Sequence, residues 1–153
     1  MHLTGKEIFD KYRALKKTYE YFMDRAKEIK ELKHIHKFES ITFIGSGSSY
    51  CLCQSAEIST KVHTPFFANS IPAGDLMLNF PYYGNYLKNT PLITSTRFGN
   101  TREVVTAIRK AKNKYGIPCI SICAKDDTKV AALVDFSDEG VVPLLFTSAN
   151  LNQ

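Results

Sequence analysis

The sequence predicts an α/β protein with three layers, in which a parallel, doubly wound sheet of five strands follows a long N-terminal helix. From about residue 40 onward, short apolar runs rich in β-branched residues alternate with longer amphipathic runs. Such alternation is typical of parallel strands joined by helical crossovers. Before residue 40, one apolar stripe recurs at helical spacing. We therefore divide the chain into a helical extension, residues 1–39, and one domain, residues 40–153.

The helical extension begins at Thr4, a good N-cap residue, and Glu7 completes a capping box. Its apolar stripe consists of Ile8, Tyr12, Leu15, Tyr19, Phe22, Ala26 and Ile29. Such a stripe must be buried against the rest of the domain or against a second chain. We expect a homodimer or a larger homo-oligomer.

Composition and charge indicate a globular, cytoplasmic protein. The 153 residues are 44% hydrophobic and 23% charged, as in ordinary soluble domains. No run approaches the ~18 apolar residues of a membrane span, and no secretory signal follows Met1. The net charge of +5 includes a basic run at residues 109–114, which we interpret as a solvated helix face. We expect no membrane and no nucleic-acid partner, because groove-reading elements are not interleaved with the basic residues.

The cysteine and histidine spacings predict no metal site. Neither cysteine pair has the spacing of a zinc ribbon or of a thioredoxin motif, and we interpret all four as buried small hydrophobes. They are Cys51, Cys53, Cys119 and Cys123. The pair His34 and His36 has no third ligand nearby in sequence.

Nine elements are predicted after the extension. The strands are expected at residues 40–44, 65–69, 91–95, 118–124 and 140–145, and the helices at 49–62, 73–79, 100–115 and 129–134. Within the first of these helices, the residues expected to face inward are Leu52, Cys53, Ala56, Ser59 and Val62. Asn100 is expected to cap the third, and Gly116 to end it.

Right-handed crossovers favour the strand order 2-1-3-4-5, the flavodoxin-like arrangement. The first and third strands are then neighbours, so the loops that follow them face each other. These loops are residues 45–49, Gly-Ser-Gly-Ser-Ser, and residues 94–101, Thr-Ser-Thr-Arg-Phe-Gly-Asn-Thr.

Two kinds of cofactor loop fit the first of these segments poorly. A Walker A loop needs a lysine that is missing here. A dinucleotide fingerprint needs a glycine where Tyr50 stands, and an acid after the second strand, which ends Ala68-Asn69-Ser70. We therefore expect no cofactor.

A metal-free phosphate site fits better. A helix N-terminus offers free N–H groups and the positive end of the helix dipole, and serine and threonine hydroxyls can add donors. Two such helix starts would surround one phosphate monoester. The alternative is that these residues are ordinary caps and turn residues.

The two loops together resemble the sugar isomerase (SIS) domain family. The segment G-S-G-S-S-Y is similar to that family's first loop, and S-T-R-F-G-N-T-R-E to its S-x-S-G-x-T loop. The entry helix L-T-G-K-E-I-F resembles that of double-domain members, such as the isomerase half of glucosamine-6-phosphate synthase and the galactosamine-6-phosphate deaminase/tagatose-6-phosphate isomerase group. The resemblance runs from about Thr4 to Phe136.

The resemblance implies a site for a sugar phosphate. Its residues are Gly47, Ser48, Ser49, Thr96, Arg97, Gly99, Asn100 and Thr101. Ser49 matches the first-loop serine that contacts phosphate, Thr96 the first hydroxyl of the second loop, and Thr101 its helix-start threonine. Phe98 departs from the pattern, because the family usually has a second phosphate-binding serine there.

The resemblance also implies aldose–ketose isomerisation or deamination of hexose or hexosamine 6-phosphates. In double-domain relatives the catalytic Glu, His and Lys come largely from a second repeat or a neighbouring subunit. Gln153 falls where a first repeat usually finishes, so we expect one half of the usual enzyme and assign no catalytic residue. Glu57 and Glu103 are local candidates for a base, with helix surface and capping box as their structural alternatives. The other functional reading is a non-catalytic phosphosugar sensor.

Overall fold

The computed structural model describes residues 38–123 and 127–134, together with residues 12, 13, 16, 17, 19, 20, 23 and 24. Its elements are β1 (Ser40–Gly45), α3 (Ser48–His63), β2 (Phe67–Pro72), α4 (Ala73–Tyr83), β3 (Leu92–Thr96), α5 (Arg102–Tyr115) and β4 (Cys119–Cys123). The eight described residues before Phe38 are helical. The rest of the predicted N-terminal helix, the histidine pair and the predicted fifth strand lie outside the described residues.

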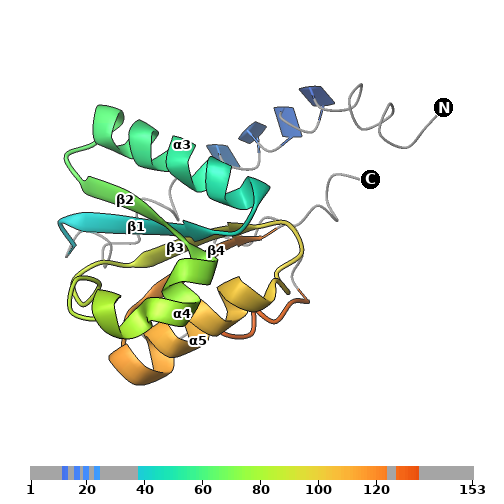
Figure 1. The fold of residues 1–153 in the computed structure, drawn as a ribbon. Helices are drawn as coiled ribbons and strands as arrows, with labels where there is room; N and C mark the ends of the chain where they lie inside the picture. Colours follow the sequence, from blue (N-terminus) through green and yellow to red (C-terminus); the bar gives the residue numbers. More distant parts are fainter. Residues whose placement is uncertain are drawn as a thin grey trace.

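The sheet has the order β2-β1-β3-β4, and each neighbouring pair is parallel. This confirms the first four strands of the predicted order. Helix α3 covers one face of the sheet, and α4 and α5 cover the other (Figure 1). The three layers follow from right-handed crossovers, which place successive helices on opposite faces where the strand order reverses.

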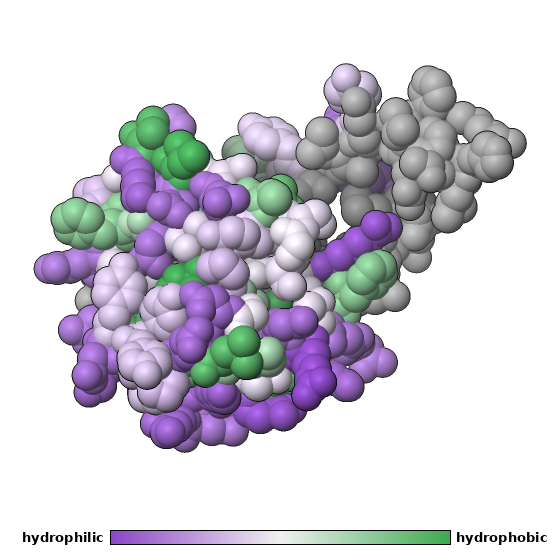
Figure 2. All heavy atoms as spheres, in the orientation of Figure 1, coloured by the Kyte–Doolittle hydropathy of each residue, from purple (hydrophilic) through white to green (hydrophobic). Residues whose placement is uncertain are grey.

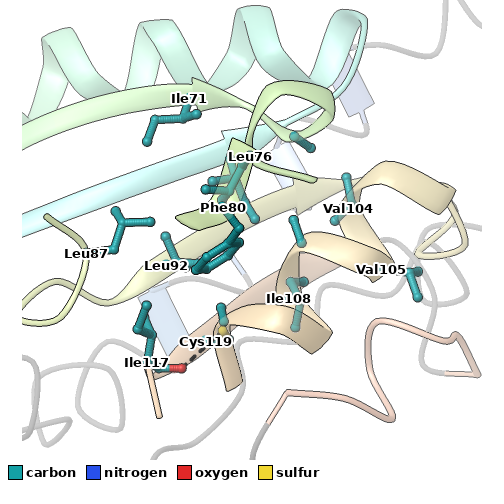
Figure 3. Close-up of a cluster of buried hydrophobic side chains, with 14 of the residues drawn as sticks. Ile71, Leu76, Phe80, Leu87, Leu92, Val104, Val105, Ile108, Ile117 and Cys119 are labelled. Carbon is teal, nitrogen blue, oxygen red and sulfur yellow. Dashed lines mark hydrogen bonds between the residues drawn. The ribbon is translucent and has the colours of Figure 1, made fainter. Parts of the chain in front are cut away.

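The main hydrophobic core lies between the sheet and the pair α4–α5 (Figure 3). Leu76 and Phe80 of α4 and Ile108 of α5 are buried against Ile44 and Leu92 of the sheet. The Phe80 ring stacks on Tyr115, with ring centroids 4.8 Å apart. Because α4 and α5 share this core, they hold their first turns in fixed positions at one edge of the sheet.

Helix α3 differs from its prediction in the side chains that it buries. Of the five residues expected to face inward, Cys53 is buried and Ala56 half-buried, whereas Leu52, Ser59 and Val62 are exposed. Ile58 is also exposed. Three of the four cysteines are buried as predicted, and Cys51 is exposed. Helix α3 therefore carries an apolar outer face, and Figure 2 shows hydrophobic residues gathered where the helix ends.

Three element boundaries also differ from the prediction. Strand β2 starts two residues later than expected, and α4 continues through Pro81 to Tyr83, with a non-helical residue at Asn79. The N-cap of α5 is Thr101 rather than Asn100. Residues 128–134 form hydrogen-bonded turns in place of the predicted helix. Gly116 ends α5 as predicted, in the left-handed conformation at φ 61°.

Two lysines of the basic run bind backbone carbonyls. Lys110 Nζ donates to the Met77 carbonyl at 2.6 Å, and Lys112 Nζ donates to the Leu133 carbonyl at 2.8 Å. They tie α5 to α4 and to the turns after β4, so part of this run is structural. Within the described ranges, none of the helices has the length and apolar character needed to cross a membrane.

Candidate functional site

The candidate site lies at the carboxyl edge of the sheet, where β1 and β3 end side by side. Ile44 pairs with Thr94 in the register of these two strands. The first loop leads from Gly45 into α3, and the second leads from Thr96 into α5. The structure thus brings the two predicted loops to neighbouring strand ends.

Two glycines shape the first loop. A Cβ atom on Gly45 would lie 2.8 Å from backbone atoms of Ser49 and Tyr50, so only glycine lets α3 start this close to the strand. Gly47, the N-cap of α3, has φ 57°, which favours glycine. The loop is closed by hydrogen bonds from Ser49 N to the Ser46 carbonyl and from Tyr50 N to the Gly47 carbonyl.

The start of α3 has no side-chain cap. Because its N-cap residue is glycine, no side-chain oxygen accepts a hydrogen bond from the first turn. Ser48 is exposed and Ser49 is half-buried. The first turn therefore combines uncapped N–H groups with two hydroxyls, which is the donor set that an anion needs.

The second loop is folded around the Thr96 hydroxyl. Thr96 is buried, and its Oγ1 accepts a hydrogen bond of 3.2 Å from Gly99 N. Gly99 has φ 60°. The bonded Thr96 oxygen keeps its own O–H as a donor. Thr101, the N-cap of α5, is half-buried and makes no side-chain capping bond.

Arg97 and Phe98 lie at the rim of this loop. Both side chains are exposed, and the Arg97 guanidinium lies over the Phe98 ring, 5.2 Å from its centroid. This contact is a cation–π interaction. The phenyl group therefore holds the one arginine of the second loop at the surface of the site.

Asn100 has a different local role from the one predicted. Its Oδ1 accepts a hydrogen bond of 3.0 Å from Lys129 N, and Gly99 O accepts one from Val130 N. These bonds join the second loop to the turns after β4. Asn100 thus fixes the loop in place instead of capping α5.

The two candidate bases have different surroundings. Glu57 accepts hydrogen bonds from Lys61 Nζ and Ser70 Oγ, each at 2.6 Å, and these bonds hold the pKa of its carboxyl below the ordinary value. Glu103 lies in the first turn of α5. The capping box predicted for it is not formed, because the N-cap is Thr101 and makes no side-chain bond.

A third helix start reaches the same edge, and the sequence analysis assigned it no role. Gly45 pairs with Pro72, so α4 begins beside the first loop. Asp75, in its first turn, accepts hydrogen bonds from Asn79 Nδ2 at 2.6 Å and from Tyr83 Oη at 2.5 Å. The only sequence signal was an acid just after the second strand region, four residues before Asn79.

A cleft of about 850 Å³ lies at the opposite edge of the sheet, where β1 and β2 begin. It is lined by Glu39, Ser40, Lys61, Phe67, Ala68, Asn69, Tyr86 and Asn89. None of these is a predicted site residue. The geometry of the helix starts, rather than the size of a cleft, therefore defines the candidate site.

Comparisons with solved structures support this fold assignment. Tagatose-6-phosphate ketose/aldose isomerase from Escherichia coli is 26% identical over 79% of this chain, with a TM-score of 0.64, and the match covers 34% of that protein. The structure of E. coli CFT073 c3406 in complex with a sugar phosphate is 20% identical, with a TM-score of 0.66, and covers 99% of this chain and 81% of that one. Vibrio vulnificus NanR complexed with ManNAc-6P is 20% identical, with a TM-score of 0.56, over 82% of this chain and 48% of that one. This chain thus spans about a third of the tagatose-6-phosphate isomerase.

Curated protein sequences give no significant match. The SIS domain model, in contrast, matches residues 34–137. That match covers more than half of the chain and includes both loops, the starts of α3, α4 and α5, and all four strands. The protein belongs to the SIS domain family.

Proposed function

We propose that this chain is a phosphosugar-binding SIS domain of an aldose–ketose isomerase or an amino-sugar-phosphate deaminase that acts on hexose or hexosamine 6-phosphates. The carrying observation is the pair of helix starts, α3 and α5, which follow neighbouring strands and have no side-chain cap. A dianionic phosphate supplies the acceptors that these N–H groups lack. The positive ends of two helix dipoles favour its charge.

In this proposal each loop contributes donors of its own. Ser48, Ser49 and the Gly47 backbone would bind the phosphate from the first loop. From the second loop, Thr96, Thr101 and the backbone at Gly99 would bind it, and Arg97 would add positive charge. Asn100 supports this arrangement through its bond to Lys129.

The relatives support a sugar phosphate as the ligand. The similar structures include a tagatose-6-phosphate isomerase and two complexes with sugar phosphates, those of c3406 and of NanR. NanR favours a second candidate function, a phosphosugar sensor without catalysis, because its printed complex holds a phosphosugar in a protein of the same fold. Turnover of a bound sugar phosphate would separate the enzyme from the sensor.

Isomerisation needs a base that moves a proton between C1 and C2 of the sugar. Glu57 is poorly suited, because both of its carboxylate oxygens already accept short hydrogen bonds from Lys61 and Ser70. Glu103 is the better local candidate, since it lies in the first turn of α5 and is not part of a capping box.

We further propose that the protein is a cytoplasmic homodimer or larger homo-oligomer. The exposed apolar residues of α3 add to the predicted apolar stripe of the N-terminal extension, of which Tyr12 and Tyr19 are exposed. Two uncovered apolar surfaces in one chain favour self-association.

A thermal-shift titration tests the ligand. It would use glucosamine-, galactosamine-, fructose- and tagatose-6-phosphate, each beside its unphosphorylated sugar. A ligand at about 100 times its Kd adds about 2.7 kcal/mol to the free energy of unfolding. We expect a higher Tm with the phosphorylated sugars alone. A matched variant, Ser49→Ala, should reduce the shift, and no shift with any phosphorylated sugar would refute the proposed site.

A further inference from the structure

The first turn of α4 lies beside both phosphate loops. Pro72, the N-cap of α4, pairs with Gly45 at the start of the first loop. In the next turn, a Cβ atom on Gly74 would have Glu103 Cγ, from the first turn of α5, as its nearest neighbour at 3.9 Å. Helices α4 and α5 are thus in contact at their N-terminal ends. Any ligand held by the two loops has the start of α4 beside it.

Asp75 is held rigidly at this position. Its two carboxylate oxygens accept separate hydrogen bonds, from Asn79 one turn later and from Tyr83 two turns later. Tyr83 itself is half-buried against the main core. A surface carboxylate that only adds solubility has no need of two donors from its own helix, so this arrangement indicates that the direction of the carboxylate matters.

The hydrogen bonds also fix the charges. The Tyr83 hydroxyl first and the Asn79 amide second lower the pKa of Asp75, so the carboxyl is ionised at neutral pH. The same contact raises the pKa of Tyr83, and Tyr50 adds to that rise. Tyr50 is in the first turn of α3, so its electrostatic effect places the Asp75–Tyr83 pair near the first loop.

A carboxylate offers about four lone-pair positions, and the two bonds from Asn79 and Tyr83 occupy two of them. The remaining positions can accept hydrogen bonds from a ligand. A phosphate is excluded there by like charge, whereas hydroxyl groups, and above all an ammonium group, are favoured. The anionic end and the donor end of a ligand would therefore bind at different helix starts.

We propose that Asp75 is a specificity-determining residue that binds the sugar end of the ligand and selects a 2-amino sugar phosphate over its 2-hydroxy and 2-acetamido counterparts. This inference rests on the proposed phosphosugar function. Tyr83 and Asn79 are positioning residues that aim the carboxylate. The phosphate remains at the starts of α3 and α5.

Calorimetric titration tests the proposal, with glucosamine 6-phosphate, glucose 6-phosphate and N-acetylglucosamine 6-phosphate as probes. Asp75→Asn keeps an oxygen that can accept from Tyr83 but removes the charge. A hydrogen bond to a charged group contributes roughly 1.5–3 kcal/mol, which corresponds to a loss of about tenfold or more in affinity. We expect that loss for glucosamine 6-phosphate, and less than a threefold change for glucose 6-phosphate.

Two further variants make the result specific. Asp127→Asn removes one exposed charge after β4 and should leave the selectivity unchanged. Tyr83→Phe keeps the carboxylate but removes the bond that most lowers its pKa. The loss of glucosamine 6-phosphate binding on acidification should therefore move to higher pH in this variant, which a purely structural tyrosine would not cause.

The outcomes separate this inference from the proposed function. If the wild type binds no phosphosugar, the proposed function fails and the inference fails with it. If the wild type binds them but Asp75→Asn weakens the three probes equally or not at all, the inference alone is overturned. The same holds if Asp127→Asn changes selectivity as much as Asp75→Asn does.

Discussion

Gly99 lies so close to Thr128 that a Cβ atom on the glycine would overlap the threonine side chain. Gly99 also has φ 60°, a conformation that L-residues with a side chain rarely adopt. The turn after β4 is therefore packed directly on the second phosphate loop. Hydrogen bonds from Val130 N to Gly99 O and from Lys129 N to Asn100 Oδ1 complete this contact.

Gly99→Ala should destabilise the protein through two separate costs. The left-handed conformation costs about 1–2 kcal/mol for an alanine, and the overlap with Thr128 adds to it. Gly116→Ala is the matched control, because Gly116 has φ 61° and a Cβ atom there meets nothing within 4 Å. Urea unfolding should give a larger loss of unfolding free energy for Gly99→Ala than for Gly116→Ala. Equal losses would contradict the close packing of Thr128 on the loop.

Phe98→Ser should tighten phosphosugar binding. The substitution removes an exposed ring and supplies the hydroxyl that SIS loops resembling this one have at this place, and it frees the Arg97 guanidinium from the ring below it. One added hydrogen bond to a phosphate contributes roughly 1.5–3 kcal/mol, so the Kd should fall about tenfold or more. Calorimetry with tagatose 6-phosphate measures this.

Phe98→Ala serves as the control, since it removes the ring without adding a donor. A gain in affinity for the serine variant that exceeds the gain for the alanine variant belongs to the hydroxyl. Unchanged titrations for both variants would mean that the loop is not at the phosphate.

Glu57 should make the stability of the protein depend on pH below neutrality. Its pKa is lowered in the folded state, by Lys61 first and then by Ser70, from an ordinary value of 4.5. Its stabilising contribution is therefore complete above pH 4.5 and declines as the pH falls through the lower folded value. Glu57→Gln should reduce the Tm at pH 7 and have a smaller effect at pH 3. A difference in Tm that stays constant across this range would exclude the ion pair as its cause.

Much of the fold could be predicted because the sequence patterns were long and consistent. The strand order followed from the alternation of apolar runs and from crossover handedness, and Gly116 marked the end of α5 correctly. The paired loops were placed because parallel strands end at a common edge. These features depend on local sequence and on topology alone.

The errors arose where tertiary contacts decide. Asn100 is a good capping residue by type, yet Lys129, distant in sequence, takes its side-chain oxygen. Leu52 and Val62 fit an inward stripe as well as an outward one, because α3 is apolar on more than one side. The bond between Asp75 and Tyr83 spans two helical turns and a non-helical residue at Asn79, and no spacing rule anticipates it.

The outer face of α3 should mediate self-association. Cys51, Ile58 and Val62 recur at helical spacing on this face, and all three are exposed. The small residues Ser55 and Ser59 lie between them and allow another helix to approach closely. Figure 2 shows by contrast that hydrophilic residues cover the lower part of the molecule, where α5 lies (Figure 1). We expect sedimentation at micromolar concentration to show a dimer or a larger species.

A lysine at Ile58 or at Val62 should shift this species to a monomer, because a buried, unpaired ammonium group is costly at an interface. Asn113→Lys adds the same charge to an exposed position of α5, on the opposite face of the sheet, and should leave the sedimentation profile unchanged. Since both positions are exposed in the single chain, the variants should keep the wild-type circular dichroism. A wild type that sediments as a clean monomer would refute self-association altogether. An oligomer that persists in both lysine variants would place the interface elsewhere on the chain.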